Sequence, residues 1–420
     1  MDDLLFLTHR IPYPPDKGDK IRSFHWLQGL SSRFRIHLAT FIDDPRDEAH
    51  VDALHRYCES LHVVRLRRHR LALAALPAFA RREALSLAVY RDAGLRAWLS
   101  DVCRRHSIVA ALAFSSGVAP YLAAPELRTV RKVVDFVDVD SDKWRQYASG
   151  ARWPKRWIYA REARCLVRDE ARLARLSDVS VLVSPAEAAL FGRQVSSRVP
   201  IEAIENGVDV EFFDPRRSYP NPYTHSKVLV FTGAMDYAAN ADAVNWFANE
   251  VFADVRERCP QAAFYIVGSN PSPSVRRLSE LPGVVVTGRV PDVRPYLAHA
   301  AAAVAPLRLA RGVQNKVLEA LAMDRPVLAT PQAVEGLEEG VSVIDAVTDC
   351  ASDLAARAVA LLQGGSPIEP GRRRAFVQQR YSWQRSVDRL SAALRDVVAG
   401  TRGADLTAGE ISGMSSSIIQ

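Results

Sequence analysis

Long apolar segments are scarce in this chain of 420 residues. The longest candidate, LALAALPAFA at 71–80, falls well short of the roughly 18 apolar residues that cross a bilayer, and Pro77 interrupts it. Asp2 and Asp3 stand before the first apolar run, which is not the pattern of a signal peptide. We therefore expect a cytoplasmic protein.

Cysteine is also scarce. The sequence has five, and no two of them have the spacing of a metal-ligand or redox pair: Cys58, Cys103, Cys165, Cys259 and Cys350. We expect them to be buried thiols in a reducing compartment. A G-x-G-x-x-G motif is missing after the first strand of either half, which argues against an oxidoreductase that binds a dinucleotide.

What is present is an ordinary globular composition with a surplus of positive charge. Hydrophobic residues make up 48% and charged residues 25% of the chain. One compact core rarely extends over 420 residues, so two domains are expected. The net charge of +7 favours anionic partners such as nucleotides and phospholipid surfaces. No nucleic-acid partner is expected, because the basic residues are not interleaved with an aromatic platform.

Short apolar runs alternate with helical stretches, and the pattern occurs twice. The first series of strands is predicted at 4–9, 35–42, 61–66, 108–114, 131–137 and 179–184. The second begins at 227–233 and ends in PVLAT at 326–330. This alternation is typical of parallel sheets covered by helices, so the predicted fold class is α/β with two Rossmann-like, doubly wound domains.

Composition also predicts the domain boundaries. A segment with three prolines and no periodicity, 214–226, is predicted as a linker between domains at 1–213 and 227–380. A helix at 381–399 is expected to cross back to the first domain, and a small, polar tail at 400–420 to be disordered. Parallel sheets bind ligands at the carboxyl ends of their strands, so two facing edges would form a central cleft.

Five motifs carry a family resemblance. ENGVDVEFFDP (205–215), VLVFTGAMDY, FYIVGS, VVVTGRVPDV and NKVLEALAMDRPVLAT occur in the order seen in family 4 retaining glycosyltransferases of the GT-B fold. The resemblance covers roughly residues 1–395. The start, THRIPYPPDKGDKIRSFHWLQGL, and GAMDYAANADAVNWF are similar to the sugar transferases of PEP-CTERM/exosortase exopolysaccharide clusters.

The resemblance implies a donor-nucleotide site at the start of the helix after Gly312. Backbone N–H groups around Gln314 and Asn315 would bind a diphosphate, and Lys316 would add a point charge. Glu319, one helical turn on, would accept from ribose hydroxyls. The alternative is a surface Lys–Glu pair at i,i+3 on an amphipathic helix.

Two departures from the family pattern affect this site. Arg311 stands where the family commonly has a first glutamate, and it is expected to pair with a phosphate or an acidic sugar. The loop from Gly233 to Asn240 has no cation, so phosphate charge would be met by Lys316 and by Arg308 or Arg311. Asn240 itself is expected to cap its helix.

The segment TGRV also belongs to the implied donor site. The resemblance implies that the backbone at Arg289 and Val290 contacts the nucleobase edge.

The first domain supplies the implied acceptor side. Asp138 ends a predicted strand where relatives carry a catalytic aspartate, so we expect it to orient the acceptor hydroxyl or to take its proton. Asp140 and Ser141 are its expected neighbours. The alternative is that Asp138 caps the next helix. DVD also matches a metal signature of the other large transferase fold, but no metal or other cofactor is expected here.

The loop after the first strand, PPDKGDKIR, is implied to cover the diphosphate. Gly18 would allow close backbone approach, and Lys17 and Lys20 would add charge on the acceptor side. The alternative is an ordinary turn with solvated lysines.

Two basic stretches, 65–82 and 152–175, indicate contact with an anionic inner-membrane surface. The second stretch contains Trp153 and Trp157 near its start. Such contact suits a lipid-linked glycan acceptor, whereas the alternative is a solvated cationic helix face.

The sequence therefore predicts a retaining glycosyltransferase that uses a nucleotide-diphosphate sugar in exopolysaccharide biosynthesis. Two alternatives share the architecture: a sugar-nucleotide 2-epimerase and a non-catalytic nucleotide-sugar-binding assembly factor.

Overall fold

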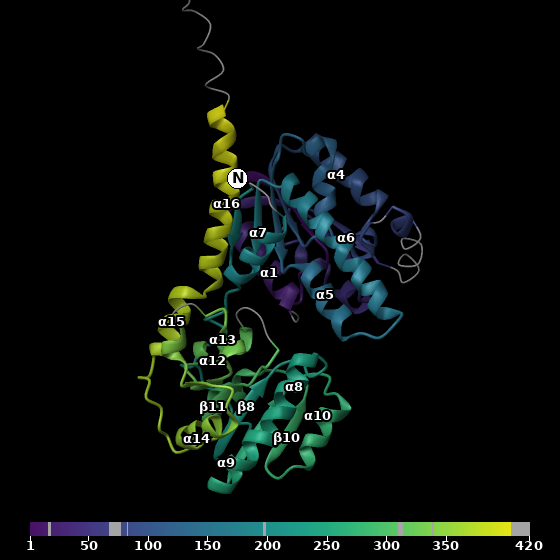
Figure 1. Cartoon of the computed structure of the whole chain (residues 1–420). Helices are drawn as coiled ribbons and strands as arrows, with labels where there is room; N and C mark the ends of the chain where they lie inside the picture. Colours follow the sequence, from purple (N-terminus) through teal and green to yellow (C-terminus); the bar gives the residue numbers. More distant parts are fainter. Residues whose placement is uncertain are drawn as a thin grey trace, which may run out of the picture. The chain divides into compact units, whose positions relative to one another are not determined.

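The chain folds into two compact units. The computed structural model describes residues 1–15, 18–66, 77–81, 83–195, 199–309, 314–337 and 340–404. One unit contains residues 1–204 and the chain from Val387 onward, and the other contains residues 205–386 (Figure 1). The first break therefore lies upstream of the boundary predicted after residue 213.

The reason for this earlier break is a set of contacts in the second unit. Val208 pairs with Ser382 as an isolated parallel bridge. Arg374 donates from Nη1 to the carbonyl oxygen of Phe213 and from Nη2 to that of Val210. Residues 205–213 are thereby held by the second unit.

The first unit is built on a parallel sheet of seven strands in the order β3-β2-β1-β4-β5-β6-β7. These strands are β1 (Asp2–Thr8), β2 (Phe34–Ile42), β3 (Ser60–Arg65), β4 (Ile108–Phe114), β5 (Arg131–Val137), β6 (Val179–Leu182) and β7 (Ile201–Ala203). Residues 3–8 of β1 are all buried, as the unbroken apolar run of a central parallel strand requires.

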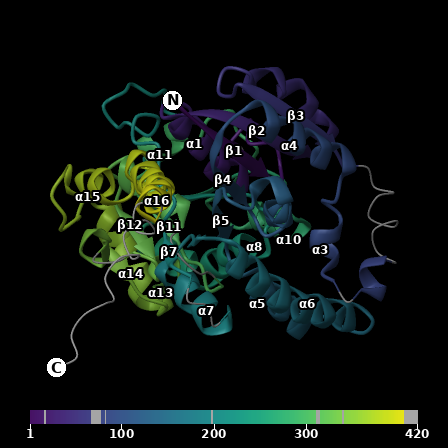
Figure 2. The same cartoon turned by 90° about the horizontal axis from the view of Figure 1, so that it is seen from above.

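The helices of the first unit fill the connections between parallel strands. They are α1 (Gly18–Ser31), α3 (Leu85–Ala88), α4 (Ala93–Arg105), α5 (Asp140–Gly150), α6 (Lys155–Leu176) and α7 (Pro185–Val195). α5 and α6 lie side by side, as Figure 2 shows. The Asp92 side chain caps α4 by accepting from the N–H of Leu95.

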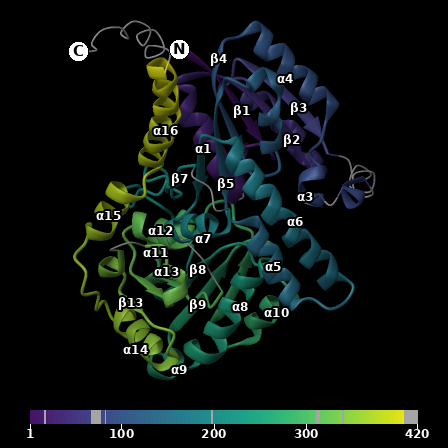
Figure 3. The ribbon, with the colours of Figure 1, turned by 45° about the horizontal axis from the view of Figure 1, so that its top comes forward.

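A last helix, α16 (Trp383–Ala404), returns the chain to the first unit. It packs against α1 (Figure 3), where a Cβ atom at Gly29 would lie 2.5 Å from Val387 Cγ2. Arg389 Nη2 donates to the carbonyl oxygen of Ala203, and Arg33 forms an ion pair with Asp388. α16 extends past residue 400 into the segment predicted as tail, and residues 405–420 lie outside the described part.

The second unit has a parallel sheet of six strands in the order β10-β9-β8-β11-β12-β13. These strands are β8 (Lys227–Thr232), β9 (Ala262–Val267), β10 (Val284–Gly288), β11 (Ala302–Ala305), β12 (Val327–Ala329) and β13 (Ala346–Val347). Both units therefore have the predicted α/β architecture of alternating parallel strands and helices.

Helices surround the second sheet (Figure 1). They are α8 (Ala238–Trp246), α9 (Phe252–Arg258), α10 (Pro273–Arg277), α11 (Arg294–His299), α12 (Asn315–Ala322), α13 (Pro331–Val334), α14 (Ala351–Leu362) and α15 (Arg372–Arg380). A π-helical turn, Phe247–Val251, joins α8 to α9. The rings of Phe247 and Phe264 pack in the core with centroids 4.8 Å apart.

Candidate active site

Glycines follow or end three neighbouring strands at the carboxyl edge of the second sheet. Gly233 follows β8, Gly268 follows β9 and Gly288 ends β10. The N–H of Gly233 donates to the carbonyl oxygen of Val267 over 3.0 Å, and the N–H of Gly268 donates to that of Gly288 over 3.1 Å. A Cβ atom at Gly268 would lie 1.6 Å from the carbonyl oxygen of Gly233. The edge is thus closed by backbone contact that only glycine permits.

Lys316 lies directly over this edge. Its Nζ donates to Asn240 Oδ1 over 2.5 Å and lies 4.1 Å from the centroid of the Phe231 ring. Asn240 Nδ2 in turn donates to the carbonyl oxygen of Ala234 over 2.8 Å. A Cβ atom at Gly233 would come within 3.3 Å of Lys316 Nζ, so the glycine leaves room for the ammonium group.

Asn240 does not act as the helix cap that the sequence suggested. α8 begins at Ala238 with Tyr237 as its N-cap residue, and no side chain caps it. The Asn240 amide instead connects the loop backbone to Lys316.

The charges of Lys316 and Glu319 are both disfavoured in this position. Burial lowers the pKa of Lys316 to about 7, although the negative charge of Glu319 opposes the shift. Burial raises the pKa of Glu319 to about 7, opposed by Lys316. An ammonium has three donors, so the bond to Asn240 leaves two for an anion. A phosphate bound here would restore the charged form of the lysine.

Lys316 and Glu319 are brought to this edge by α12. The helix is amphipathic and buries Val317, Leu318 and Leu321 against the core. Gln314 is its N-cap residue and Asn315 its first residue. The first N–H groups of an α-helix have no acceptor within it, so this end suits an anion.

The other residues predicted at the donor site differ in their exposure, and some lie outside the described part of the chain. Arg289 is exposed and Val290 is partly buried, both directly after Gly288, whose φ of +71° favours glycine. Arg311 lies outside the described residues, as do residues 310, 312 and 313.

Arg308 is already paired. Its Nε lies 3.0 Å from Asp242 Oδ2, and the Asp242 carboxylate raises the pKa of the guanidinium. Of the cations predicted to meet the phosphate charge, Arg311 lies outside the described residues and Arg308 is paired, which leaves Lys316 among the described residues.

At the carboxyl edge of the first sheet, β5 ends in a strained residue. Val137 has a φ of +68°, a left-handed conformation that a β-branched side chain rarely adopts and that costs about 1–3 kcal/mol. The buried Asp135 carboxylate accepts from the Val137 N–H at 3.1 Å, from Arg22 Nε at 2.8 Å and from Trp26 Nε1 at 2.8 Å. This network fixes the backbone that carries Asp138.

Asp138 is exposed at this edge. Desolvation of the carboxylate by the surrounding protein and the negative charges of Glu187 and Asp140 raise its pKa to about 6. The positive charge of Lys143 acts in the opposite direction. α5 begins at Asp140 after Val139, and its N-cap has no side-chain hydrogen bond, so Asp138 does not cap the helix. Its carboxylate is mostly ionised at neutral pH and can accept a hydroxyl proton.

The two neighbours of Asp138 differ. Asp140 accepts from Ser116 Oγ over 2.5 Å at the same edge. Ser141 is fully buried and hydrogen-bonded to Glu170: its N–H and its hydroxyl donate to the carboxylate over 2.9 and 2.7 Å. Gln194 Nε2 also donates to the Ser141 hydroxyl. The prediction of an acceptor contact at Ser141 is therefore corrected: the hydroxyl is enclosed and used internally.

The loop before α1 also requires a correction. Lys20 is buried, and its Nζ lies 2.8 Å from both carboxylate oxygens of Asp47. Its charge is used inside the unit, so it is not an acceptor-side lysine. Gly18 is the first residue of α1 and leaves open space around its α-carbon. Lys17 lies outside the described residues.

Sequence reasoning missed an ionic network that follows β1. His9 stacks on Phe114, and its Nε2 lies 3.4 Å from Asp19 Oδ2. Arg10 Nη1 donates to Asp19 over 2.5 Å and Nη2 donates to Asp43 over 2.7 Å. Hydrogen bonding from His9 and the charge of Arg10 hold the pKa of Asp19 well below its usual range despite burial. The signal was available, because His9 and Arg10 directly follow a strand that ends at the ligand-binding edge.

Comparison with known proteins gives this geometry a context. Residues 226–364, within the second unit, match the family described as "Glycosyl transferases group 1". A search of curated proteins finds no match to the chain.

Solved structures share the fold over nearly the whole chain. Sucrose-phosphate synthase from Thermosynechococcus elongatus has a TM-score of 0.62 at 17% identity, covering 95% of this chain and 100% of its own. HepE from Anabaena, in complex with UDP, has a TM-score of 0.61 at 14% identity, covering 94% and 100%. TarM from S. aureus, with UDP among its ligands, has a TM-score of 0.63 at 9% identity, covering 94% and 100%.

The chain therefore has the GT-B fold, and residues 226–364 of its second unit match the glycosyltransferase group 1 family. Together these findings support a glycosyltransferase.

Proposed function

We propose that this protein is a retaining glycosyltransferase that moves a sugar from a nucleoside diphosphate sugar to a lipid-linked glycan during exopolysaccharide biosynthesis. The observation that carries the donor assignment is the position of Lys316. Its ammonium lies at the start of α12, beside Gly233 and bonded to Asn240, at the ligand-binding edge of the sheet. The HepE and TarM structures, which have the same fold and contain UDP, support the proposal that this chain binds a nucleotide.

In the proposed reaction, an acceptor hydroxyl oxygen bonds to the anomeric carbon as the bond to the β-phosphate oxygen breaks. The nucleoside diphosphate leaves with the bonding electrons. Lys316 and the N-terminal N–H groups of α12 stabilise the negative charge that develops on it. Asp138 orients the hydroxyl, whose proton passes to this carboxylate or to the leaving phosphate. Because the oxygen would attack the face that the diphosphate leaves, the anomeric configuration is retained without a covalent intermediate and without a metal.

The α5–α6 region supports a membrane-bound acceptor. Trp153 is 83% exposed and Trp157 is 50% exposed at the start of α6. Arg152 and Arg156 are exposed beside them. Aromatic rings beside cations suit the interface of an anionic bilayer. No helix in the described part of the chain is long and apolar enough to cross a membrane, so we propose peripheral contact at the inner membrane.

A thermal-shift panel of nucleoside diphosphates and their sugars tests the donor assignment. One donor class should raise the Tm, and Lys316→Ala and Glu319→Ala should reduce that rise. Lys227→Ala is the matched control, because Lys227 begins β8 and lies at the other end of the strand from Gly233. Equal shifts in all variants would place the donor elsewhere.

Product analysis tests the chemistry. With donor and a lipid-linked acceptor, the new glycosidic bond should keep the donor's anomeric configuration by NMR, and transfer should be lost in Asp138→Ala while donor binding persists. Conversion of the donor alone to an epimeric sugar nucleotide would identify an epimerase instead. Donor binding without hydrolysis or transfer would identify an assembly factor.

A further inference from the structure

Potential metal ligands gather at the amino-terminal end of the first sheet. Asp3 lies near the start of β1, His37 lies in β2, and His106 lies two residues before the start of β4. β2, β1 and β4 are consecutive in the sheet. One ligand atom from each side chain lies within 4.8 Å of the others. None of these residues belongs to the proposed transfer site.

The cluster is largely enclosed. His37 is 0% exposed and Asp3 is 4% exposed, while His106 remains partly exposed. His37 Nε2 lies 3.1 Å from Asp3 Oδ1. The His37 and His106 rings have centroids 4.3 Å apart. Two imidazoles and one carboxylate thus meet in a region where buried polar groups require partners.

We propose that Asp3, His37 and His106 bind a divalent transition-metal ion, with zinc preferred. Two imidazoles and a carboxylate form a donor set that zinc accepts readily. Zinc bond lengths of about 2.0–2.2 Å place neighbouring tetrahedral ligands about 3.4 Å apart. His37 and Asp3 are already near that separation, and rotation of the partly exposed His106 side chain completes a three-ligand site.

A second layer of contacts orients the two buried ligands. Ser60 Oγ lies 2.8 Å from His37 Nδ1, and Arg35 Nη2 donates to the other Asp3 oxygen over 2.7 Å. When Ser60 accepts from Nδ1–H, the Nε2 lone pair of His37 faces the Asp3 carboxylate. A cation between these two atoms turns that repulsion into attraction, and in the metal-free protein a proton on Nε2 takes its place.

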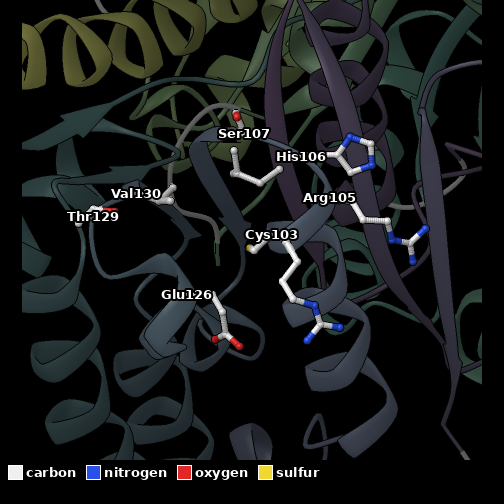
Figure 4. A pocket seen from close by; sticks show the side chains of 9 residues that line it. Cys103, Arg105, His106, Ser107, Glu126, Thr129 and Val130 are labelled. Carbon is white, nitrogen blue, oxygen red and sulfur yellow. The ribbon is translucent and has the colours of Figure 1, made fainter.

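An open pocket adjoins the cluster at His106. It has a volume of about 300 Å³, and His106 forms part of its wall together with Cys103 and Glu126 (Figure 4). Two arginines of this wall, Arg104 and Arg105, form ion pairs with Asp101, which reduces their repulsion of an incoming cation. A water molecule from this side can occupy the fourth zinc position.

The site would be a structural metal site rather than a catalytic one. It joins three neighbouring strands at one end of the sheet, whereas Asp138 and His9 lie at the other end. With a rise of about 3.3 Å per strand residue, Asp3 and His9 are separated by roughly 20 Å along the chain. Zinc binding at this site is therefore independent of the proposed transferase activity.

Zinc binding to the full chain tests the proposal. Protein treated with a chelator and dialysed is titrated with ZnCl₂ by calorimetry, and its Tm is measured with and without zinc. We expect one zinc per chain and a rise in Tm that disappears in His106→Gln. Ser60→Ala should weaken binding by about 10–100-fold, the effect of losing a contact to a metal ligand. His55→Gln, at an exposed histidine of the same unit, should bind zinc as the wild type does.

Cobalt(II) provides a second measurement that does not depend on stability. The wild type should develop the visible absorption bands of cobalt in a four-coordinate nitrogen and oxygen site, and His106→Gln should not. Asp3→Asn should also lose them, provided circular dichroism shows a folded protein. Absence of zinc binding, or equal binding by the wild type and His106→Gln, would overturn the proposal.

Discussion

Lys316 and Asn240 lie 76 residues apart in the sequence, and their side chains meet with Nζ 2.5 Å from Oδ1. Because Asn240 also donates to the carbonyl oxygen of Ala234, it holds the lysine and the glycine-containing loop in one arrangement. Lys316, which the family resemblance implied as a donor-site residue, is thereby fixed over the carboxyl edge of a parallel sheet. This contact is the structural basis of the proposed donor site.

Replacing Asn240 should therefore weaken nucleotide binding. A hydrogen bond to a charged group contributes about 1.5–3 kcal/mol, so Asn240→Ala is expected to reduce affinity for the preferred nucleoside diphosphate by at least 10-fold. Isothermal titration calorimetry measures the change. Asn249→Ala is the matched control, because the exposed Asn249 Nδ2 donates to the nearby carbonyl oxygen of Asn245 within its own helical segment. Unchanged affinity in Asn240→Ala would show that the asparagine does not position Lys316 for binding.

Gly268→Ala should destabilise the second unit and remove donor binding. The new Cβ atom would overlap the Gly233 carbonyl group, and both positions are backbone, so relief requires the two loops to separate. We expect a Tm several degrees lower, which corresponds to about 1–3 kcal/mol for an overpacked site. Gly150→Ala, in open space at the end of α5, should leave the Tm within a degree or raise it slightly. Similar melting of both variants would contradict the close contact.

The rate of transfer should follow the ionisation of Asp138. The carboxylate is the form that accepts a proton, and its pKa is about 6, so the rate should fall as pH drops below 6. Asp138→Asn should reduce transfer by about 10²–10⁴-fold and abolish this acidic limb. A pH–rate profile that is identical in Asp138→Asn would exclude the carboxylate from the reaction.

Stability should respond to the same substitution in the opposite direction. When folding raises the pKa of a carboxyl group, the free energy of unfolding falls as the pH rises from the ordinary pKa of that group to about 6. Above pH 6 the folded protein therefore carries a disfavoured charge, which Asp138→Asn removes. We expect the Tm at pH 7.5 to stay constant or to rise, measured by calorimetry beside the loss of activity. A marked fall in the Tm would indicate a structural role.

The buried pair beneath Asp138 should behave as a unit. Arg22→Met leaves the Asp135 carboxylate buried without its guanidinium partner, which typically costs about 3–5 kcal/mol. The double variant Arg22→Met/Asp135→Leu removes both charges and should recover much of that stability, as urea unfolding would show. Because Asp135 also holds the strained Val137, the double variant should still lose transfer activity. Additive losses of stability would contradict the coupling.

Sequence alone was sufficient for the long, apolar parts of the fold. β4 and β5 match their predicted limits. β4 is an unbroken apolar run, which is typical of a buried parallel strand, and β5 carries the branched and aromatic residues that strands favour. The edge strands β7 and β13 were not predicted, because they are three and two residues long and carry no periodic signal. The α/β class was predictable from the sequence because it depends on the central strands, whose apolar pattern is clear.

The candidate sites were predictable as positions rather than as contacts. The sequence placed Asp138 and Lys316 at strand or helix ends, and each lies at a carboxyl edge. It could not show that Lys20 is paired with Asp47 or that Ser141 serves Glu170, because these partners are distant in sequence. Tertiary pairing decides whether a polar residue is available to a ligand, and the sequence pattern does not record it.

The central claim is that Lys316 binds the diphosphate of the donor. Burial lowers the pKa of this lysine to about 7, so at pH 8 much of it is neutral, and a bound dianion should draw a proton onto Nζ. Calorimetric titration with the preferred nucleoside diphosphate in two buffers of different ionisation enthalpy measures this proton uptake. We expect uptake approaching one proton in the wild type and in Lys227→Met. In Lys316→Met we expect almost no proton uptake and an affinity at least 10-fold weaker. Equal affinity and equal proton uptake in Lys316→Met would contradict it.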